Sequence, residues 1–220
     1  MAKFKSGILG PISGKVGSVI GSSWNGVHYL RSRSSKSVKP ATKAQAEVRT
    51  KFKLASEVVK PLMPFYRIGY AAASGNITVR NKAMQQVIRG CITGELPDLL
   101  VEYEKIQLAD GYLPPIVDGA VRANTGATLD VVWTYDRANR EALATDHLMF
   151  AAYCPELNQA TVNHLLAVRE NETVTMKLPA HYKGNTVHCY AAFVSTESFI
   201  EHPRPEAISV SSYLGAVDVL

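Results

Sequence analysis

From about Val101 to the end of the chain, apolar and polar residues alternate, and turn-type residues separate the alternating runs. Alternation with a period of two predicts strands that bury one face. In the run 127–135, for example, Leu129, Val131 and Trp133 fall on the same face. The strands predicted in this way cover residues 100–108, 127–135, 147–154, 161–168, 172–178, 186–194 and 207–217.

Between residues 41 and 98 the apolar spacing is helical. Five apolar residues recur at intervals of three or four: Ala44, Val48, Phe52, Ala55 and Val59. This spacing predicts a helix with one buried face. Thr42 and Gln45 form a capping-box pattern at its start, and Pro61 is expected to end it. A second helix is predicted within residues 78–90, with Gly90 as its stop signal.

The first 40 residues contain a strong hairpin signal. Asn25 and Gly26 are the preferred pair for a two-residue type I′ turn, and two runs of extended-type residues flank them. A hairpin closed there pairs Trp24 with Val27 and leaves a second face that is rich in glycine. Because a lone hairpin is marginal in water and strand glycines suit a close backbone neighbour, we expect the ribbon to lie against a partner.

The stretch 7–21 also suggests a phosphate-binding loop, since it holds five glycines and a lysine. A Walker loop needs four residues between its first glycine and the Gly-Lys pair, followed by Ser or Thr. Here Gly10 is followed by only three residues before Gly14 and Lys15, and Val16 stands where the hydroxyl is required. The sequence therefore predicts no nucleotide cofactor.

These patterns predict an α+β protein with three parts. Residues 1–40 form a basic, glycine-rich β-hairpin arm, and residues 41–98 form a helical segment. Residues 99–220 form an immunoglobulin- or fibronectin-like β-sandwich, because short strands at this spacing with a Trp in an inner strand are typical of that fold. Trp133 is expected in the sandwich core.

Charge separates the two ends of the chain, which has 220 residues and a net charge of +5. Residues 1–60 hold twelve Lys and Arg against Glu47 and Glu57, whereas residues 61–220 hold twelve Lys and Arg against seventeen acids. A basic arm on an acidic body suits contact with a neighbouring copy or with nucleic acid. The charge count alone does not separate these two alternatives.

The order of several motifs resembles a group of uncharacterised bacterial proteins, some of them phage-like. In the first part of the chain the resemblance lies in Gly14-Lys15-Val16-Gly17, Trp24-Asn25-Gly26, Arg31, Pro40, Thr42, Gln45, Arg49 and Phe52. In the second part it lies in Trp133, Asp146, Tyr153, the segment 178–195 and the ending 209–215. The resemblance implies a ribbon, a helical segment and a β domain that occur together, with an association with phage or assembly genes. It implies no activity for particular residues.

No catalytic or metal site is predicted. The six histidines form no HxH, HxxxH or HExxH pattern. Cys91, Cys154 and Cys189 are far apart and are expected to be buried thiols. The acid pairs Asp136 with Asp146, and Glu170 with Glu172, are spaced as they are in many loop-rich chains. We therefore predict that the protein is not an enzyme and has no metal or cofactor.

The preferred prediction is a self-associating structural protein, a homo-oligomer whose arm docks on a neighbouring subunit in a phage-like or other repetitive particle. The predicted contact residues are Gly14, Gly17, Gly21, Trp24, Tyr29, Arg31 and Arg33. The alternative is a nucleic-acid-binding module, in which the phosphate contacts are Lys15, Arg31, Arg33, Lys36 and Lys39. With no signal peptide or membrane span in the sequence, a cytoplasmic protein or a particle released by lysis is expected. No small-molecule substrate is evident.

Overall fold

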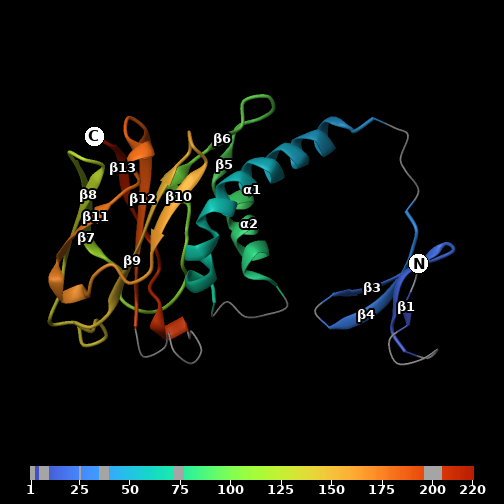
Figure 1. Ribbon diagram of the computed structural model, residues 1–220, viewed down its shortest axis with the longest axis horizontal. Coiled ribbons are helices and arrows are strands. Elements are labelled where there is room, and N and C mark those ends of the chain that lie inside the picture. The colour runs from blue at the N-terminus through green and yellow to red at the C-terminus, as the bar shows by residue number, and fades with distance from the viewer. Residues whose placement is uncertain (1–2, 5–9, 25, 35–39, 72–76, 196–204) are drawn as a thin grey trace. The chain divides into compact units, whose positions relative to one another are not determined.

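The computed structural model describes residues 3–4, 10–24, 26–34, 40–71, 77–195 and 205–220 (Figure 1). The chain divides into an N-terminal unit, Met1–Thr42, and a C-terminal unit, Lys43–Leu220. Each unit is described by itself. The protein has an α+β fold with mostly β strands and two α-helices among the described residues.

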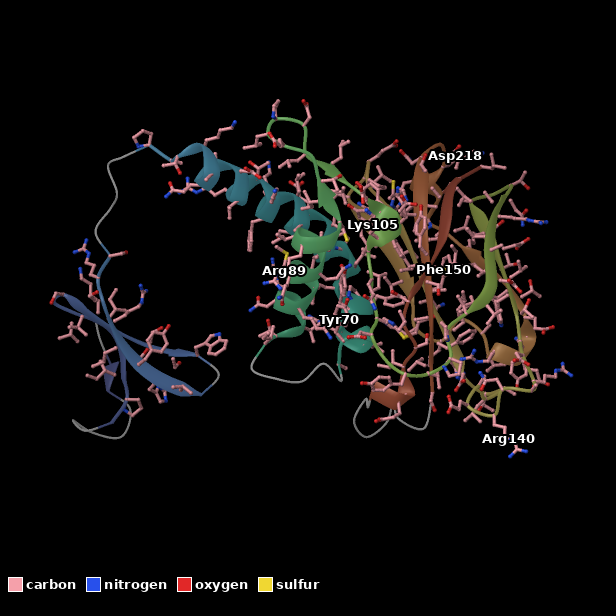
Figure 2. The ribbon with its side chains drawn as sticks, turned by 180° about the vertical axis from the view of Figure 1, so that it is seen from behind. Tyr70, Arg89, Lys105, Arg140, Phe150 and Asp218 are labelled. Atoms are coloured by element: carbon pink, nitrogen blue, oxygen red, sulfur yellow. The ribbon has the colours of Figure 1, made fainter. Side chains whose placement is uncertain are left out.

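The C-terminal unit is built around two antiparallel sheets. The three-stranded sheet has the order β11-β8-β7, and the four-stranded sheet has the order β10-β9-β12-β13. Their strands are β7 (Val117–Asn124), β8 (Thr128–Thr134), β9 (His147–Cys154), β10 (Gln159–Asn163), β11 (Thr173–Lys177), β12 (Thr186–Val194) and β13 (Ser212–Asp218). The two sheets pack face to face through one buried cluster that contains Trp133, Phe150 and Phe193. Figure 2 shows Phe150 among the strands and Arg140 projecting from a loop.

Both faces of the central strands β9 and β12 are buried, which makes the unit three layers deep (Figure 1). Val187, Cys189, Ala191 and Phe193 face the other sheet, as the alternation predicts. The intervening residues of β12, such as Tyr190, join a second cluster with the helices. The helices therefore pack on the outer face of the four-stranded sheet, a point that the sequence had left open.

Helix α1 (Lys43–Gly69) begins where the capping pattern predicts, but it does not end at Pro61. It continues through Pro61 and Pro64, although each proline removes a helical hydrogen bond. Leu62, Phe65 and Tyr66 beyond the first proline are fully buried, and their packing offsets this loss. The prediction of a stop at Pro61 was therefore wrong, because tertiary burial outweighs the local penalty.

Helix α2 (Val79–Gly90) confirms the second predicted helix. The side chain of Thr78 accepts a hydrogen bond from the backbone N–H of Asn81 and caps its first turn. Ala83, Met84 and Val87 form its buried face. The helical pattern and the stop at Gly90 are therefore reproduced in the structure.

Four expectations for the strands need correction. The strand expected at 207–217 is β13, which begins only at Ser212. Residues 100–108 were expected as one strand, but only β6 (Leu100–Val101) is extended, paired with β5 (Ile92–Thr93), and a 3₁₀ turn follows at Tyr103–Lys105. The strand expected at 161–168 is β10, which ends at Asn163. Strand β7 was not predicted, because its sequence VDGAVRAN has few bulky apolar residues and it lies at a sheet edge.

A buried ion pair joins several segments of the C-terminal unit. Arg169 Nε lies 3.1 Å from Asp146 Oδ2, and both side chains are at most 4% exposed. Arg169 Nη2 donates to the carbonyl oxygen of Pro114 at 2.8 Å, and its guanidinium lies 3.7 Å from the centre of the Phe193 ring. The carbonyl oxygen of Arg169 accepts from Trp133 Nε1 at 2.8 Å. Burial raises the pKa of the Asp146 carboxyl above its ordinary value, and the charge of Arg169 acts against this shift.

Replacing Arg169 with Met is expected to lower the free energy of unfolding by about 3–5 kcal/mol, because it leaves the Asp146 carboxylate buried without its partner. Urea unfolding followed by circular dichroism measures the change. The control is Lys53→Met, which removes an exposed ion pair with Glu57 on the surface of α1. The loss of unfolding free energy in this control is expected to stay within about 1 kcal/mol. Equal costs for the two variants would contradict a special role for the buried pair.

Candidate interaction surfaces

The N-terminal unit is a sheet of order β1-β2-β3-β4. Its strands are β1 (Lys3–Phe4), β2 (Ile12–Val16), β3 (Val19–Trp24) and β4 (Val27–Ser32). The predicted hairpin register is confirmed, since Trp24 pairs with Val27 and Ile20 with Arg31. The backbone N–H of Arg33 donates to the carbonyl oxygen of Ser18 at 2.8 Å, which extends this ladder. Asn25 of the turn lies outside the described residues.

The close backbone neighbour of the glycine-rich face is a strand of the same unit. Strand β2, which was not predicted, pairs with β3 so that Gly14 stands opposite Gly21. A Cβ atom added at Gly21 would overlap the carbonyl oxygen of Ile12, so only glycine permits this approach. Gly14 and Gly17 have positive φ angles of 107° and 56°. These glycines therefore serve the fold of the unit, and their role in a subunit contact stays a prediction.

The N-terminal unit leaves its large apolar side chains in solvent. Trp24 is 52% exposed, Tyr29 44% and Leu30 61%. Every residue of β4 is exposed. Among the residues of this unit whose burial is described, Gly21 alone is buried. The sheet is thus formed without an apolar core of its own in the described part.

The basic residues of the N-terminal unit lie beside these apolar side chains. Lys15 stands opposite Ile20 and Arg31 opposite the same residue from the other strand, so the three share one face of the sheet. Lys15, Arg31 and Arg33 are all exposed. Lys36 and Lys39 lie outside the described residues. The described face combines cationic groups with the rings of Trp24 and Tyr29.

The start of α1 carries a second apolar surface. Val48 and Phe52 are 67% and 56% exposed, whereas burial in α1 begins at Ala55. Figure 1 shows the first turns of α1 extending beyond α2 and the sheets. The apolar stripe of α1 is therefore covered only in its second half, where it packs on α2 and the four-stranded sheet.

A groove of about 450 Å³ lies beside β6 in the C-terminal unit. It is lined by Thr93, Leu100, Val101, Glu102, Tyr103, Glu104, His188 and Tyr213. The ring of His188 is stacked 4.2 Å from that of Tyr103, and its Nδ1 lies 2.9 Å from the hydroxyl oxygen of Tyr213. Burial lowers the pKa of His188 below its ordinary value. Glu102 forms an ion pair with Lys105.

Sequence reasoning predicted β3 and β4 as one hairpin, but it missed strand β2 and this groove. Strand β2 holds only two apolar residues, Ile12 and Val16, so alternation gives it a weak signal. A signal for the groove was the run 94–104, which holds four acidic residues and no basic one. His188 and Tyr213 come from the distant strands β12 and β13, so no local pattern could have placed them there.

The cysteines and three of the four acids considered for catalysis are placed as follows. All three cysteines are buried free thiols, as predicted, and burial raises the pKa of Cys189 to about 12. Asp146 is held by Arg169, Asp136 accepts from the backbone N–H of Ala138, and Glu172 accepts from that of Tyr135. Within the described ranges, no three His, Cys, Asp or Glu side chains come together as a metal site. No helix of the described chain has the length and apolar character needed to span a membrane.

The fold and these surfaces define a mostly β, two-unit α+β protein with exposed apolar and basic surfaces. A model of a family of unknown function (DUF6266) matches residues 11–215, and the chain belongs to that family. A comparison with curated proteins found no match.

Two half-buried histidines, His164 and His188, predict a pH dependence of stability. Burial lowers the pKa of His188 and of His164 in the folded chain, so the unfolded chain binds these protons more tightly. Stability is therefore expected to fall as the pH drops through about 6.5, the pKa of an unperturbed histidine. In His188→Gln, urea unfolding between pH 8 and pH 5 should show a shallower decline. The control is His28→Gln, at an exposed position. If the unfolding free energy of the two variants changes equally with pH, His188 is not a source of the pH dependence.

Proposed function

We propose that this protein is a non-enzymatic, self-associating structural protein whose N-terminal unit docks on a neighbouring copy. The observation that carries the proposal is the absence of a buried apolar side chain among the residues of that unit whose burial is described. A small sheet with a bare surface is marginal in water unless that surface is covered. A second chain supplies such a cover.

The apolar groups that need covering lie on both faces of the N-terminal sheet. Six of them on β2, β3 and β4 are at least 40% exposed: Val16, Val19, Trp24, Val27, Tyr29 and Leu30. Exposed Val48 and Phe52 on α1 add a further strip. Several large apolar side chains exposed on one small sheet support a protein–protein contact. Trp24, Tyr29, Arg31 and Arg33 belong to the residue types that dominate such contacts.

We further propose that the two sheets of the C-terminal unit form an immunoglobulin- or fibronectin-like sandwich. The first, second and fifth of its seven strands form one sheet, and the other four form the second. This division and the Trp133 side chain in the shared core support the assignment. A rigid sandwich with an associating appendage suits a building block of a repetitive particle, and the phage-like resemblance of the sequence favours that setting.

Light scattering tests the role of the N-terminal unit. The full chain is expected to give a mass above that of a monomer, and a chain starting at Lys43 is expected to give a lower mass. Both apolar clusters lie within residues 43–220, so the shortened chain keeps its core. The control Leu143→Lys, in the C-terminal unit, should leave the mass of the full chain unchanged. Equal masses for the full and shortened chains would remove the proposed role.

The alternative is a nucleic-acid-binding module. It is favoured by Lys15 and Arg31 on the same face as the exposed rings of Trp24 and Tyr29, since cations bind phosphate and aromatic rings stack on bases. Arg33, Lys36 and Lys39 would extend the contact. A salt-sensitive mobility shift with DNA or RNA that is lost when these lysines and arginines become Ala would support this alternative over self-association.

A further inference from the structure

Strand β4 forms one edge of the N-terminal sheet. All six of its residues are exposed, and they include Val27 and Leu30, which are 64% and 61% exposed. Natural edge strands are usually short, charged in the middle, bulged or covered, because their free backbone groups pair with any strand that reaches them. Strand β4 pairs with β3 without a register shift and carries apolar side chains on both faces. Strand β4 therefore lacks the features that normally protect an edge strand, and it is suited to pairing with another strand.

The ladder with β3 decides which backbone groups of β4 point outward. Arg33 donates its N–H to Ser18 across the ladder, so this pair is a hydrogen-bonded one. Hydrogen-bonded and non-hydrogen-bonded pairs alternate along an antiparallel ladder. Arg31, Tyr29 and Val27 therefore turn their backbone groups toward β3. The backbone N–H and C=O groups of Ser32, Leu30 and His28 point toward the open edge.

We propose that β4 pairs with β4 of a second copy across a two-fold axis, with Leu30 of one copy directly opposite Leu30 of the other. This proposal rests on the proposed self-association and names its contact. The two sheets then form one continuous sheet. The outward-pointing N–H and C=O groups of the two β4 strands then form hydrogen bonds with each other. Only another extended backbone can satisfy such a row of groups.

The side chains select this register over its neighbours. Three antiparallel registers form at least two pairs of outward-pointing residues within the strands, and they centre on Tyr29, Leu30 or Arg31. Centring on Arg31 places two guanidinium groups opposite each other, which is unfavourable. Centring on Tyr29 forms only the two His28–Leu30 pairs within the strands.

Centring on Leu30 forms a Leu30–Leu30 pair and two His28–Ser32 pairs, all with exchanged hydrogen bonds. On the other face of the sheet, this register sets Tyr29 of each copy opposite Arg31 of the other. A guanidinium over an aromatic ring is attractive, and it separates the like charges. The strand is therefore self-complementary in this register alone.

The effect of salt distinguishes β4–β4 pairing from a contact in which the N-terminal unit docks on the C-terminal unit of another copy. The N-terminal unit has only basic charged side chains, so two copies repel at long range. Added salt screens repulsion between exposed charges and should strengthen a β4–β4 contact. It should weaken a contact between the basic unit and the acidic groove near Glu104. The two modes thus respond to salt in opposite directions.

Cysteine cross-linking of the full chain tests the register, and the three native thiols are fully buried. Paired Cα atoms in an antiparallel ladder lie about 4.5–5.5 Å apart, within the range that a disulfide spans. Leu30→Cys should form a disulfide dimer under mild oxidation. Tyr29→Cys and Arg31→Cys should each stay uncross-linked alone, because like positions lie roughly 7 Å or more apart, but should cross-link when mixed.

Cross-linking of Tyr29→Cys alone, or of Arg31→Cys alone, would overturn the proposed register. A multimer by light scattering in which none of these variants cross-links would overturn the β4–β4 contact and leave self-association standing. A monomeric full chain would overturn both. In parallel, Leu30→Lys should abolish the multimer, whereas Leu165→Lys, at an exposed position of the C-terminal unit, should not. Unchanged circular dichroism confirms that each variant is folded.

Discussion

The C-terminal unit depends on the buried charge of Arg169. A guanidinium removed from water is tolerated only where its charge and its donors are met. Here Asp146 supplies the opposite charge, Pro114 supplies a carbonyl oxygen and Phe193 supplies a ring face. The partners come from the loop before β7, the loop before β9 and from β12. One side chain thereby fixes three segments that are far apart in the sequence.

The main chain of Arg169 extends this connection to the other sheet. Its carbonyl oxygen accepts from the indole of Trp133 on β8, and its N–H donates to the carbonyl oxygen of Asp146. The Trp133 ring in turn meets Phe193 edge-on, with 6.1 Å between the ring centres. The two sheets are therefore joined by directional contacts in addition to apolar packing. These contacts fix the two sheets relative to each other. The outer face of β9 and β12 is then available to pack on the helices.

The N-terminal unit has the opposite character. Its strands are held by backbone pairing and by the close approach of Ile12 to Gly21, with little side-chain burial in the described part. Apolar burial, the main favourable contribution in folding, is therefore small in this part of the unit. In the proposed self-association, the uniform positive charge of two such units opposes contact at long range. The proposed contact then depends on short-range apolar and backbone interactions, and salt would act on it through screening.

Features that arise from neighbouring residues follow from the sequence alone. The Asn25–Gly26 pair gave the hairpin register, Thr78 and Gly90 bounded α2, and alternation gave the core face of β8, because turn, capping and pleat preferences act within a few residues. Tertiary structure alone decided that α1 passes through Pro61, that β2 covers Gly21, and that Arg169 meets Asp146. These depend on contacts between segments distant in the chain, where burial free energy outweighs local preference and leaves no periodic pattern.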